Sequence, residues 1–418
     1  MPPLSPAVIS PLAVSPLAVA FPELPPVDGV RLAAGAAGIR YRDRPDLMLA
    51  ELAPGTTVAG VFTQNRCPGA PVDWCRVALR SGRARALIVN SGNANVFTGR
   101  AGREAVKASA AAAAGLIGCP ARQVFVASTG VIGEVLAHER LTAALPALYA
   151  GLSAHGFAAA ARAIMTTDTF PKAATRTAEI GGTEVRISGI AKGSGMIAPD
   201  MATMLAFVFT DAKIPAALLQ RLLAAGNARS FNAISVDSDT STSDTLLMFA
   251  TGQKGHPRPP TTGGAMLRGF RAALNEVLEE LALAIVRDGE GAERLVTIEI
   301  AGAVSGRSAR RIGLAIANSP LVKTAIAGAD ANWGRIVMAV GKAGEPADRD
   351  RLSIAIGGVT VAQAGSVVEG YDEAGVTQHM RGREIGIAVD LGLGRGTARV
   401  FTCDLTHRYI DINGSYRS

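Results

Sequence analysis

The stretch from Lys192 to Phe207 reads KGSGMIAPDMATMLAF, and it joins a glycine-rich segment to an apolar run. Lys-Gly-Ser-Gly ends a β-rich segment, Pro199 and Asp200 indicate a turn, and the apolar run begins directly after Thr203. We therefore expect a loop that enters a buried strand, with Thr203 at the first residue of that strand.

Thr203 has two interpretations. A β-branched residue often begins a strand, and this is the simpler one. If the peptide bond between Ala202 and Thr203 were cut, however, the Thr203 hydroxyl would lie beside its own free α-amine. A hydroxyl nucleophile and an amine base on one residue form the N-terminal variant of the pairing used in acyl transfer. The rest of the chain has to decide between the two.

The segments on both sides of this stretch alternate between short apolar strands and longer helical runs. Before it we predict strands at 57–63, 85–91, 123–128 and 175–190, and helices at 102–116, 141–152 and 156–165. After it we predict helices at 215–229 and 267–287, and strands at 296–300, 352–356, 385–391 and 399–405. This pattern indicates a mixed α/β fold, in which helices cover sheets.

Composition excludes several kinds of partner. The 418 residues are 48% hydrophobic and 18% charged, as in a compact folded protein. The net charge of +7 is spread along the chain without a dense basic run, so we expect no nucleic-acid partner and a mild preference for carboxylate-bearing small molecules. No apolar run reaches the length of a membrane span, and we expect a cytoplasmic protein that contacts no membrane.

The N-terminus and the cysteines suggest no further sites. Residues 1–20 are rich in Pro and repeat SPLAV at Ser10 and Ser15, which predicts a flexible extension and not a secretory signal. The cysteines show no CxxC pair and no histidine at ligand spacing, so we expect buried free thiols in a reducing cytosol and no metal. The four are Cys67, Cys75, Cys119 and Cys403.

Polar residues gather at several predicted strand and helix ends. The segment 89–98, VNSGNANVFT, fits either turn chemistry or a substrate-facing loop. Thr129 and Gly130 follow an apolar strand and offer a hydroxyl and an N–H to a ligand, although STG is common at turns. Glu290, in DGEG after a long helix, is either a solvated surface side chain or a functional carboxylate that the helix dipole disfavours. The segment 235–245, SVDSDTSTSDT, is a loop dense in short oxygen-bearing side chains.

Two common site types do not fit. In KGSG the lysine precedes the glycines and a strand follows, whereas a phosphate loop needs the lysine after the glycines and a helix next. No GxGxxG opens a helix in an early βαβ unit, and no GxSxG occurs. Nucleotide binding and serine-hydrolase chemistry are therefore disfavoured.

Seven separated motifs together resemble the ornithine acetyltransferase family of arginine biosynthesis, over about residues 21–418. The motifs are KGSGMIAPDMATMLAF, VNSGNAN, STGVIGE, TTDTFPK, RDGEGA, GADANWGR and DINGSYRS. The resemblance implies sheets sandwiched by helices in αββα layers, in a fold like that of the N-terminal-nucleophile enzymes. It also implies a precursor that cleaves itself between Ala202 and Thr203. The α chain, 21–202, and the β chain, 203–418, would then form one intertwined unit and assemble as an α2β2 heterotetramer.

The resemblance implies a glutamate N-acetyltransferase. Such an enzyme moves the acetyl group of N2-acetyl-L-ornithine to L-glutamate by a ping-pong mechanism through acetyl-Thr203, and it releases L-ornithine and N-acetyl-L-glutamate. Some family members also make N-acetylglutamate from acetyl-coenzyme A, and no motif separates the two kinds. No cofactor or metal is expected, apart from acetyl-coenzyme A as a co-substrate.

Residue roles carry over from the family by motif. Thr203 would be the nucleophile with its α-amine as base, and Thr129 and Gly130 would form the oxyanion hole. Lys192 would pair with a substrate carboxylate and Glu290 with the cationic end of ornithine. The substrate-binding positions are Thr166, Lys192, Thr203, Glu290, Asn413 and Ser418, with Thr167 as the alternative to Thr166. The family often ends in Thr, so Ser418 departs from it while keeping the hydroxyl.

Two alternatives of other classes stay open at this point. An N-terminal-nucleophile aminopeptidase of similar fold would also use Thr203, but the carboxylate-directed Lys192 and the DINGSYRS tail argue against it. A non-catalytic binding module would never cleave, and it would give a single uncut band near 42.8 kDa on a denaturing gel.

Overall fold

The apolar run after Thr203 forms strand β8 (Leu205–Thr210), and all six of its residues are buried. Ala206 and Val208 point into one hydrophobic core, whereas Phe207 and Phe209 point into another. Because successive side chains of a strand alternate between its two faces, a strand that is apolar throughout must be covered on both sides. β8 therefore lies in the middle of a layered structure.

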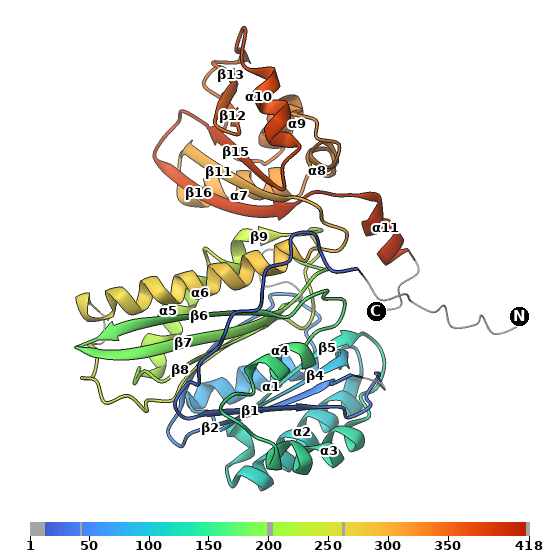
Figure 1. Ribbon diagram of the computed structural model, residues 1–418, viewed down its shortest axis with the longest axis vertical. Helices are drawn as coiled ribbons and strands as arrows, with labels where there is room; N and C mark the ends of the chain where they lie inside the picture. Colours follow the sequence, from blue (N-terminus) through green and yellow to red (C-terminus); the bar gives the residue numbers. More distant parts are fainter. Residues whose placement is uncertain (1–12, 42–43, 199–203, 261–263, 415–418) are drawn as a thin grey trace, which may run out of the picture.

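The computed structural model describes residues 13–41, 44–198, 204–260 and 264–414 (Figure 1). Ala202, Thr203 and Ser418 lie outside these residues. The described strands form three sheets. The first has the order β1 (Val30–Gly35), β2 (Leu47–Leu52), β4 (Ala86–Asn93), β5 (Val124–Val131). The second has the order β3 (Thr57–Phe62), β10 (Thr245–Ala250), β8, β7 (Thr183–Lys192), β6 (Lys172–Ile180).

These two sheets pack face to face, and helices cover their outer faces (Figure 1). The inner core contains Phe125 of the first sheet and Phe209 and Phe249 of the second; the last two rings stack with centroids 5.5 Å apart. α5 (Ala216–Asn227) and α6 (Arg268–Arg287) cover the second sheet, and α2 (Gly99–Ile117) and α3 (His138–Ala150) cover the first. The predicted mixed α/β class with αββα layers is confirmed. Two shorter helices complete this part of the chain, α1 (Ala70–Ala78) and α4 (Phe157–Ala163).

The third sheet and its helices form a separate layer, at the top of Figure 1. Its order is β14 (Ser366–Val367), β13 (Val359–Gln363), β12 (Ser353–Ile356), β15 (Glu384–Asp390), β11 (Leu295–Ala303), β16 (Gly396–Cys403), β9 (Ile234–Ser235). The helices of this part are α7 (Gly306–Ala317), α8 (Pro320–Ala327), α9 (Trp333–Gly341) and α10 (Glu373–Met380). The last helix, α11 (His407–Asn413), leads the chain back toward the sandwich (Figure 1).

The second sheet combines strands from both sides of residue 203. β7 and β8 pair antiparallel, with Lys192 opposite Leu205, and β3 pairs antiparallel with β10. The segment between Lys192 and Leu205 is therefore the connection of a β-hairpin. A cut within this connection would leave the backbone hydrogen bonds of the sheet in place, so two chains produced by it would stay together.

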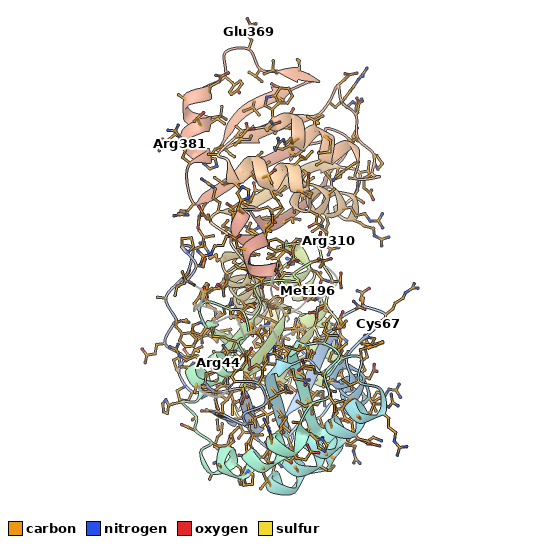
Figure 2. All side chains as sticks on the ribbon, turned by 90° about the vertical axis from the view of Figure 1, so that its right-hand side faces the viewer. Arg44, Cys67, Met196, Arg310, Glu369 and Arg381 are labelled. Atoms are coloured by element: carbon orange, nitrogen blue, oxygen red, sulfur yellow. The ribbon has the colours of Figure 1, made fainter. Side chains whose placement is uncertain are left out.

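Most predicted elements in the sandwich are present, but the end of one strand and the burial of one cysteine need correction. Strand β5 continues through Thr129 and Gly130 to Val131, where the sequence predicted its end, because Gly130 pairs with Gly92 of β4. Cys67, labelled in Figure 2, is exposed, contrary to the expectation of buried thiols. Cys75 and Cys403 are buried.

Residues 13–20, part of the expected flexible extension, pack against the sandwich. The Ser15 amide donates to Thr169 Oγ1 at 2.9 Å, and its hydroxyl donates to the Arg287 carbonyl at 2.6 Å. Leu17 is 5% exposed and belongs to the core under α6. The second SPLAV copy is thus anchored, and the first falls largely outside the described residues. In the described ranges no helix is long and apolar enough to span a membrane.

Candidate active site

A polar cleft, partly open to solvent, lies where β5 and β7 end. It brings together every predicted site residue that the structure describes, although these residues come from distant segments of the chain. They are Thr129, Gly130, Thr166, Lys192, Glu290 and Asn413. Thr167 also lines the cleft, next to Gly195, Met196 and the segment 241–243.

Lys192 presents a buried ammonium group to the cleft. It is the last residue of β7, it is 2% exposed, and its Nζ lies 3.5 Å from Thr129 Oγ1 and 3.8 Å from Asp168 Oδ2. Burial lowers the pKa of Lys192 because the charged form loses its hydration, and Asp168 opposes this shift. The positive charge of Lys192 is therefore sensitive to the carboxylates around it.

Thr129 and Gly130 stand at the end of β5, beside the ammonium of Lys192. Thr129 is 2% exposed. Gly130 has φ +129°, and a Cβ at this position would lie 2.3 Å from the carbonyl carbon of Gly92. Only glycine fits there, since any side chain would collide with the backbone of β4. A hydroxyl and a backbone N–H at such a strand end suit the stabilisation of a negatively charged oxygen.

Glu290 forms the acidic part of the cleft. The Asn413 side-chain amide donates to Glu290 Oε2 at 2.8 Å, and the Glu290 amide donates to the Ser194 carbonyl at 3.0 Å. A Cβ on Gly195 would lie 2.4 Å from the same Oε2, so a glycine lets the chain pass close to this carboxylate. Glu290 is thus held at the cleft and is not the solvated surface side chain of the simpler interpretation. Asn413 itself is exposed, at the end of α11.

The two adjacent threonines differ in their contacts. The hydroxyls of Thr167 and Ser194 form a hydrogen bond at 3.0 Å, whereas Thr166 donates from its backbone amide to Asp168 Oδ2 at 2.9 Å. The Thr167 hydroxyl is therefore already engaged within the protein. This leaves the Thr166 hydroxyl as the better candidate for a ligand.

Two acidic residues hold the ends of the connection that carries residues 199–203. Asp237 accepts hydrogen bonds from the amides of Met196 at 2.6 Å and Ile197 at 2.8 Å. Met196, labelled in Figure 2, has a φ of +58°, which is an unfavourable conformation for a residue with a side chain. On the other side, Asp244 Oδ1 accepts from the amide of Met204 at 2.8 Å.

Asp244 is fully buried, and burial raises its pKa well above the ordinary range. The hydrogen bond from the Met204 amide and the charge of Lys192 counteract this only in part. Among the described residues, Asp244 Oδ2 has no hydrogen-bond partner, and neither has Thr242 Oγ1 in the wall of the cleft. Sequence reasoning recognised the hydroxyl density of 235–245 but did not assign Ser241, Thr242 or Ser243 to the site.

The asparagine-rich segment 89–98 serves mainly as turn chemistry. The Asn90 side chain bonds the Asn93 carbonyl, and the Asn95 side chain bonds the Gly102 carbonyl, at 2.8 and 3.0 Å. Ala94 is its contribution to the cleft wall. Within the described part of the chain, no group of three or more His, Cys, Asp or Glu side chains is arranged to hold a metal ion.

The αββα sandwich and its polar cleft, which combines one buried ammonium with one carboxylate, define a layered α/β protein with a charged pocket. Residues 31–418 match the model of the ArgJ family. The chain belongs to the ArgJ family, in agreement with the resemblance that its seven motifs indicate.

Individual relatives are similar over nearly their whole length. The "Arginine biosynthesis bifunctional protein ArgJ" of Gluconobacter oxydans is 67% identical over 397 residues, which cover 95% of this chain and 94% of the relative. The protein of the same name from Bradyrhizobium diazoefficiens is 56% identical over 400 residues, with 95% and 97% covered. A crystal structure of the Bacillus halodurans protein of that name has 38% identity and a TM-score of 0.48; the match covers 50% of this chain and 98% of the solved chain.

Proposed function

We propose that this protein is a self-cleaving glutamate N-acetyltransferase of arginine biosynthesis, which transfers acetyl from N2-acetyl-L-ornithine to L-glutamate. Membership of the ArgJ family and the names of the relatives support this proposal. The observation that carries it is the cleft, which unites Thr129, Gly130, Lys192 and Glu290 beside the hairpin connection that contains Thr203.

In the first step, the Thr203 hydroxyl oxygen attacks the carbonyl carbon of Ala202 and the peptide nitrogen leaves. The resulting ester is hydrolysed by water, which releases the Ala202 carboxylate and the free α-amine of Thr203. The positive φ of Met196 and the hydrogen bonds from the amides of Met196 and Ile197 to Asp237 support a strained connection upstream of this bond.

In the second step, the α-amine of Thr203 accepts the proton of its own hydroxyl as the oxygen attacks the acetyl carbonyl. An α-amino group has a pKa of about 7.7–8.0, so a large fraction is neutral near pH 7.5. Thr129 and Gly130 stabilise the oxyanion, and loss of one such donor typically costs about 10²- to 10³-fold in rate. The ornithine amine leaves with a proton, and the amine of glutamate then attacks acetyl-Thr203 and restores the free hydroxyl.

The ammonium of the cleft suits the α-carboxylate of both substrates, and its carboxylate suits N-acetylornithine alone. Lys192 pairs with the α-carboxylate that N-acetylornithine and glutamate share, and Glu290 pairs with the δ-ammonium of N-acetylornithine. Thr166 and Asn413 contribute polar contacts. Thr203 and Ser418, outside the described residues, complete the set of substrate-binding positions.

The relatives are named bifunctional, and a second activity that suits the same nucleophile is N-acetylglutamate formation from acetyl-coenzyme A. Thioester and amide donors would give the same acetyl-Thr203. We further propose that the enzyme acts in the cytoplasm, needs no cofactor or metal, and assembles as an α2β2 heterotetramer of the two chains that the cut after Ala202 produces, with residues 1–20 as the N-terminal extension of the first. Light scattering on the purified protein measures this assembly.

The test combines processing and turnover. Purified protein on a denaturing gel should give two fragments. The N-terminal sequence of the fragment that follows the cut should be Thr-Met-Leu-Ala. Formation of N-acetylglutamate from glutamate is then measured with each acetyl donor. Thr203→Ala should stay uncut and inactive. Normal fragments from Thr203→Ala would exclude Thr203 as the nucleophile, and hydrolysis of peptide amides without acetyl transfer would favour an aminopeptidase.

A further inference from the structure

A buried ion network lies directly behind the cleft. Lys172 Nζ is 2.7 Å from Asp168 Oδ1 and 2.6 Å from Asp288 Oδ2, and all three side chains are shielded from solvent. Lys172 Nζ also donates to the Phe170 carbonyl at 3.2 Å. Buried carboxylates are costly unless a positive charge compensates them, so Lys172 stabilises both. None of the three lines the cleft.

Asp168 links this network to two residues of the cleft. Its Oδ2 accepts a hydrogen bond from the Thr166 amide at 2.9 Å and lies 3.8 Å from Lys192 Nζ. Its Oδ1 accepts from the amide of Gly193, the residue after Lys192, at 2.7 Å. One carboxylate thus fixes the backbone at Thr166, fixes the backbone beyond Lys192, and places a negative charge beside the Lys192 ammonium.

Asp288 occupies the other end of the network. It accepts hydrogen bonds from the Thr169 amide at 2.9 Å and from the Thr169 hydroxyl, besides its ion pair with Lys172. In the described part of the chain, no ion pair joins Asp288 to Lys192. Asp168 and Asp288 therefore share Lys172 as a partner, and they differ in their contact with the cleft.

We propose that Asp168 is the positioning residue of the substrate-carboxylate site: it holds the Lys192 ammonium charged and oriented, and Lys172 locks Asp168 in place. The proposal rests on the proposed function, because it takes Lys192 as the partner of the substrate carboxylate. Asp168 touches no substrate itself. With Lys172 and Lys192 protonated and both aspartates ionised, the four buried groups carry no net charge, which is a stable arrangement for a site that receives one anionic group.

Several charged groups act on Lys192. Asp168, Glu290 and Asp244 favour its protonated form, whereas Lys172 and burial favour the neutral form. Removal of the Asp168 charge therefore lowers the pKa of Lys192 further, and the ammonium loses its proton at a lower pH. The affinity for a carboxylate should decline over the same range.

The experiment is the pH profile of kcat/KM for L-glutamate, measured on the self-processed full chain with N-acetyl-L-ornithine as donor. In the wild type the acidic limb should report loss of the protons from the α-amine of Thr203 and from the attacking amine of glutamate, and the alkaline limb should report Lys192. Asp168→Asn should move the alkaline limb to lower pH. It should also raise the KM for glutamate by about tenfold or more at alkaline pH, with a smaller change in kcat, since a charge-assisted contact is lost.

Asp288→Asn is the matched control, because it removes a carboxylate from the same lysine without touching Lys192. It should leave the alkaline limb in place. An unchanged limb in Asp168→Asn, or an equal shift in both variants, would overturn the proposal. Asp168→Glu is the second variant, because it keeps the negative charge but displaces it. The alkaline limb should therefore stay in place while the KM for glutamate rises. A KM equal to that of the wild type would refute the positioning role.

Failure of the proposed function would be recognised separately. A wild type that transfers no acetyl group at any pH refutes the acetyltransferase. In that case calorimetric titration of the same variants with glutamate across pH tests Asp168 directly. We expect Asp168→Asn to bind glutamate more weakly, and its affinity to begin to fall at a lower pH than that of the wild type. Identical binding curves would exclude the role.

Discussion

The amide nitrogen of Met204 donates a hydrogen bond to Asp244 Oδ1 at 2.8 Å, which ties the start of β8 to the start of β10. Met204 directly follows the proposed nucleophile. Asp244→Ala would leave this buried N–H unpaired, at a cost of about 1–3 kcal/mol, and should slow self-cleavage. Asp244→Asn keeps an acceptor oxygen and should process almost normally. Densitometry of the uncut band over time measures both; equal rates for Ala and Asn would contradict the role of this bond.

Gly130→Ala should damage the end of β5. The added Cβ would meet the backbone of Gly92, and a residue at φ +129° is strained regardless of space. Overpacking of this kind costs about 1–3 kcal/mol and displaces the proposed oxyanion donor. Thermal unfolding and acetyl transfer measure the two effects. Gly115→Ala, a helical position with nothing within 4 Å of the added Cβ, is the control and should lose neither stability nor activity.

Glu290→Gln should separate the two half-reactions. Its carboxylate is proposed to pair with the δ-ammonium of N-acetylornithine, and glutamate carries no such group. The KM for N-acetylornithine should rise by about tenfold, because a hydrogen bond to a charged partner is weakened, while the KM for glutamate changes little. Glu293→Gln, at a side chain 54% exposed, is the control. Equal loss for both substrates would argue against charge recognition by Glu290.

Asp237 should make the stability of the protein depend on pH. Burial raises the pKa of Asp237 to about 6, against an ordinary value near 4. Between these two values the folded state binds more protons than the unfolded state, so this group's contribution to stability is complete below about pH 4 and is lost as the pH rises through 6. Asp237→Asn should therefore flatten the decline in the free energy of unfolding between pH 4 and 6, relative to the wild type.

Urea unfolding at several pH values measures how steeply the free energy of unfolding falls between pH 4 and 6. The neighbouring exposed Asp239 supplies the control variant, Asp239→Asn, which should retain the wild-type slope. Parallel curves for wild type and Asp237→Asn would show that Asp237 is not the titrating group.

Leu17→Ala should destabilise the sandwich, although the residue lies in a Pro-rich N-terminal segment. The Leu17 side chain is 5% exposed and packs under α6, and truncation of a buried leucine typically costs about 2–5 kcal/mol. Val19→Ala, at a side chain 47% exposed, should cost much less. Denaturant midpoints compare the two; equal midpoints would show that residues 13–20 do not contribute to the fold.

Sequence patterns predicted the elements whose signals are local. The helical spacing of apolar residues in α6 and the apolar run of β8 each fall within one continuous segment, so side-chain spacing alone reveals both elements. Strands β1 and β2 and helices α7–α10 were not predicted. The 13–20 segment was wrongly grouped with a flexible tail, since its anchors, Thr169 and Arg287, are more than a hundred residues away.

The sequence by itself determined the mixed α/β class, the family through its seven motifs, and the expected site residues. Only the tertiary structure decided that Thr129 and Lys192 meet across 63 residues, and that Asp168, Lys172 and Asp288 form one network behind them. The reason is physical: an ion pair between residues 116 positions apart leaves no periodic trace in the chain. The ion pair forms because α6 packs against the second sheet, which brings Asp288 at the end of α6 to Lys172 at the start of β6.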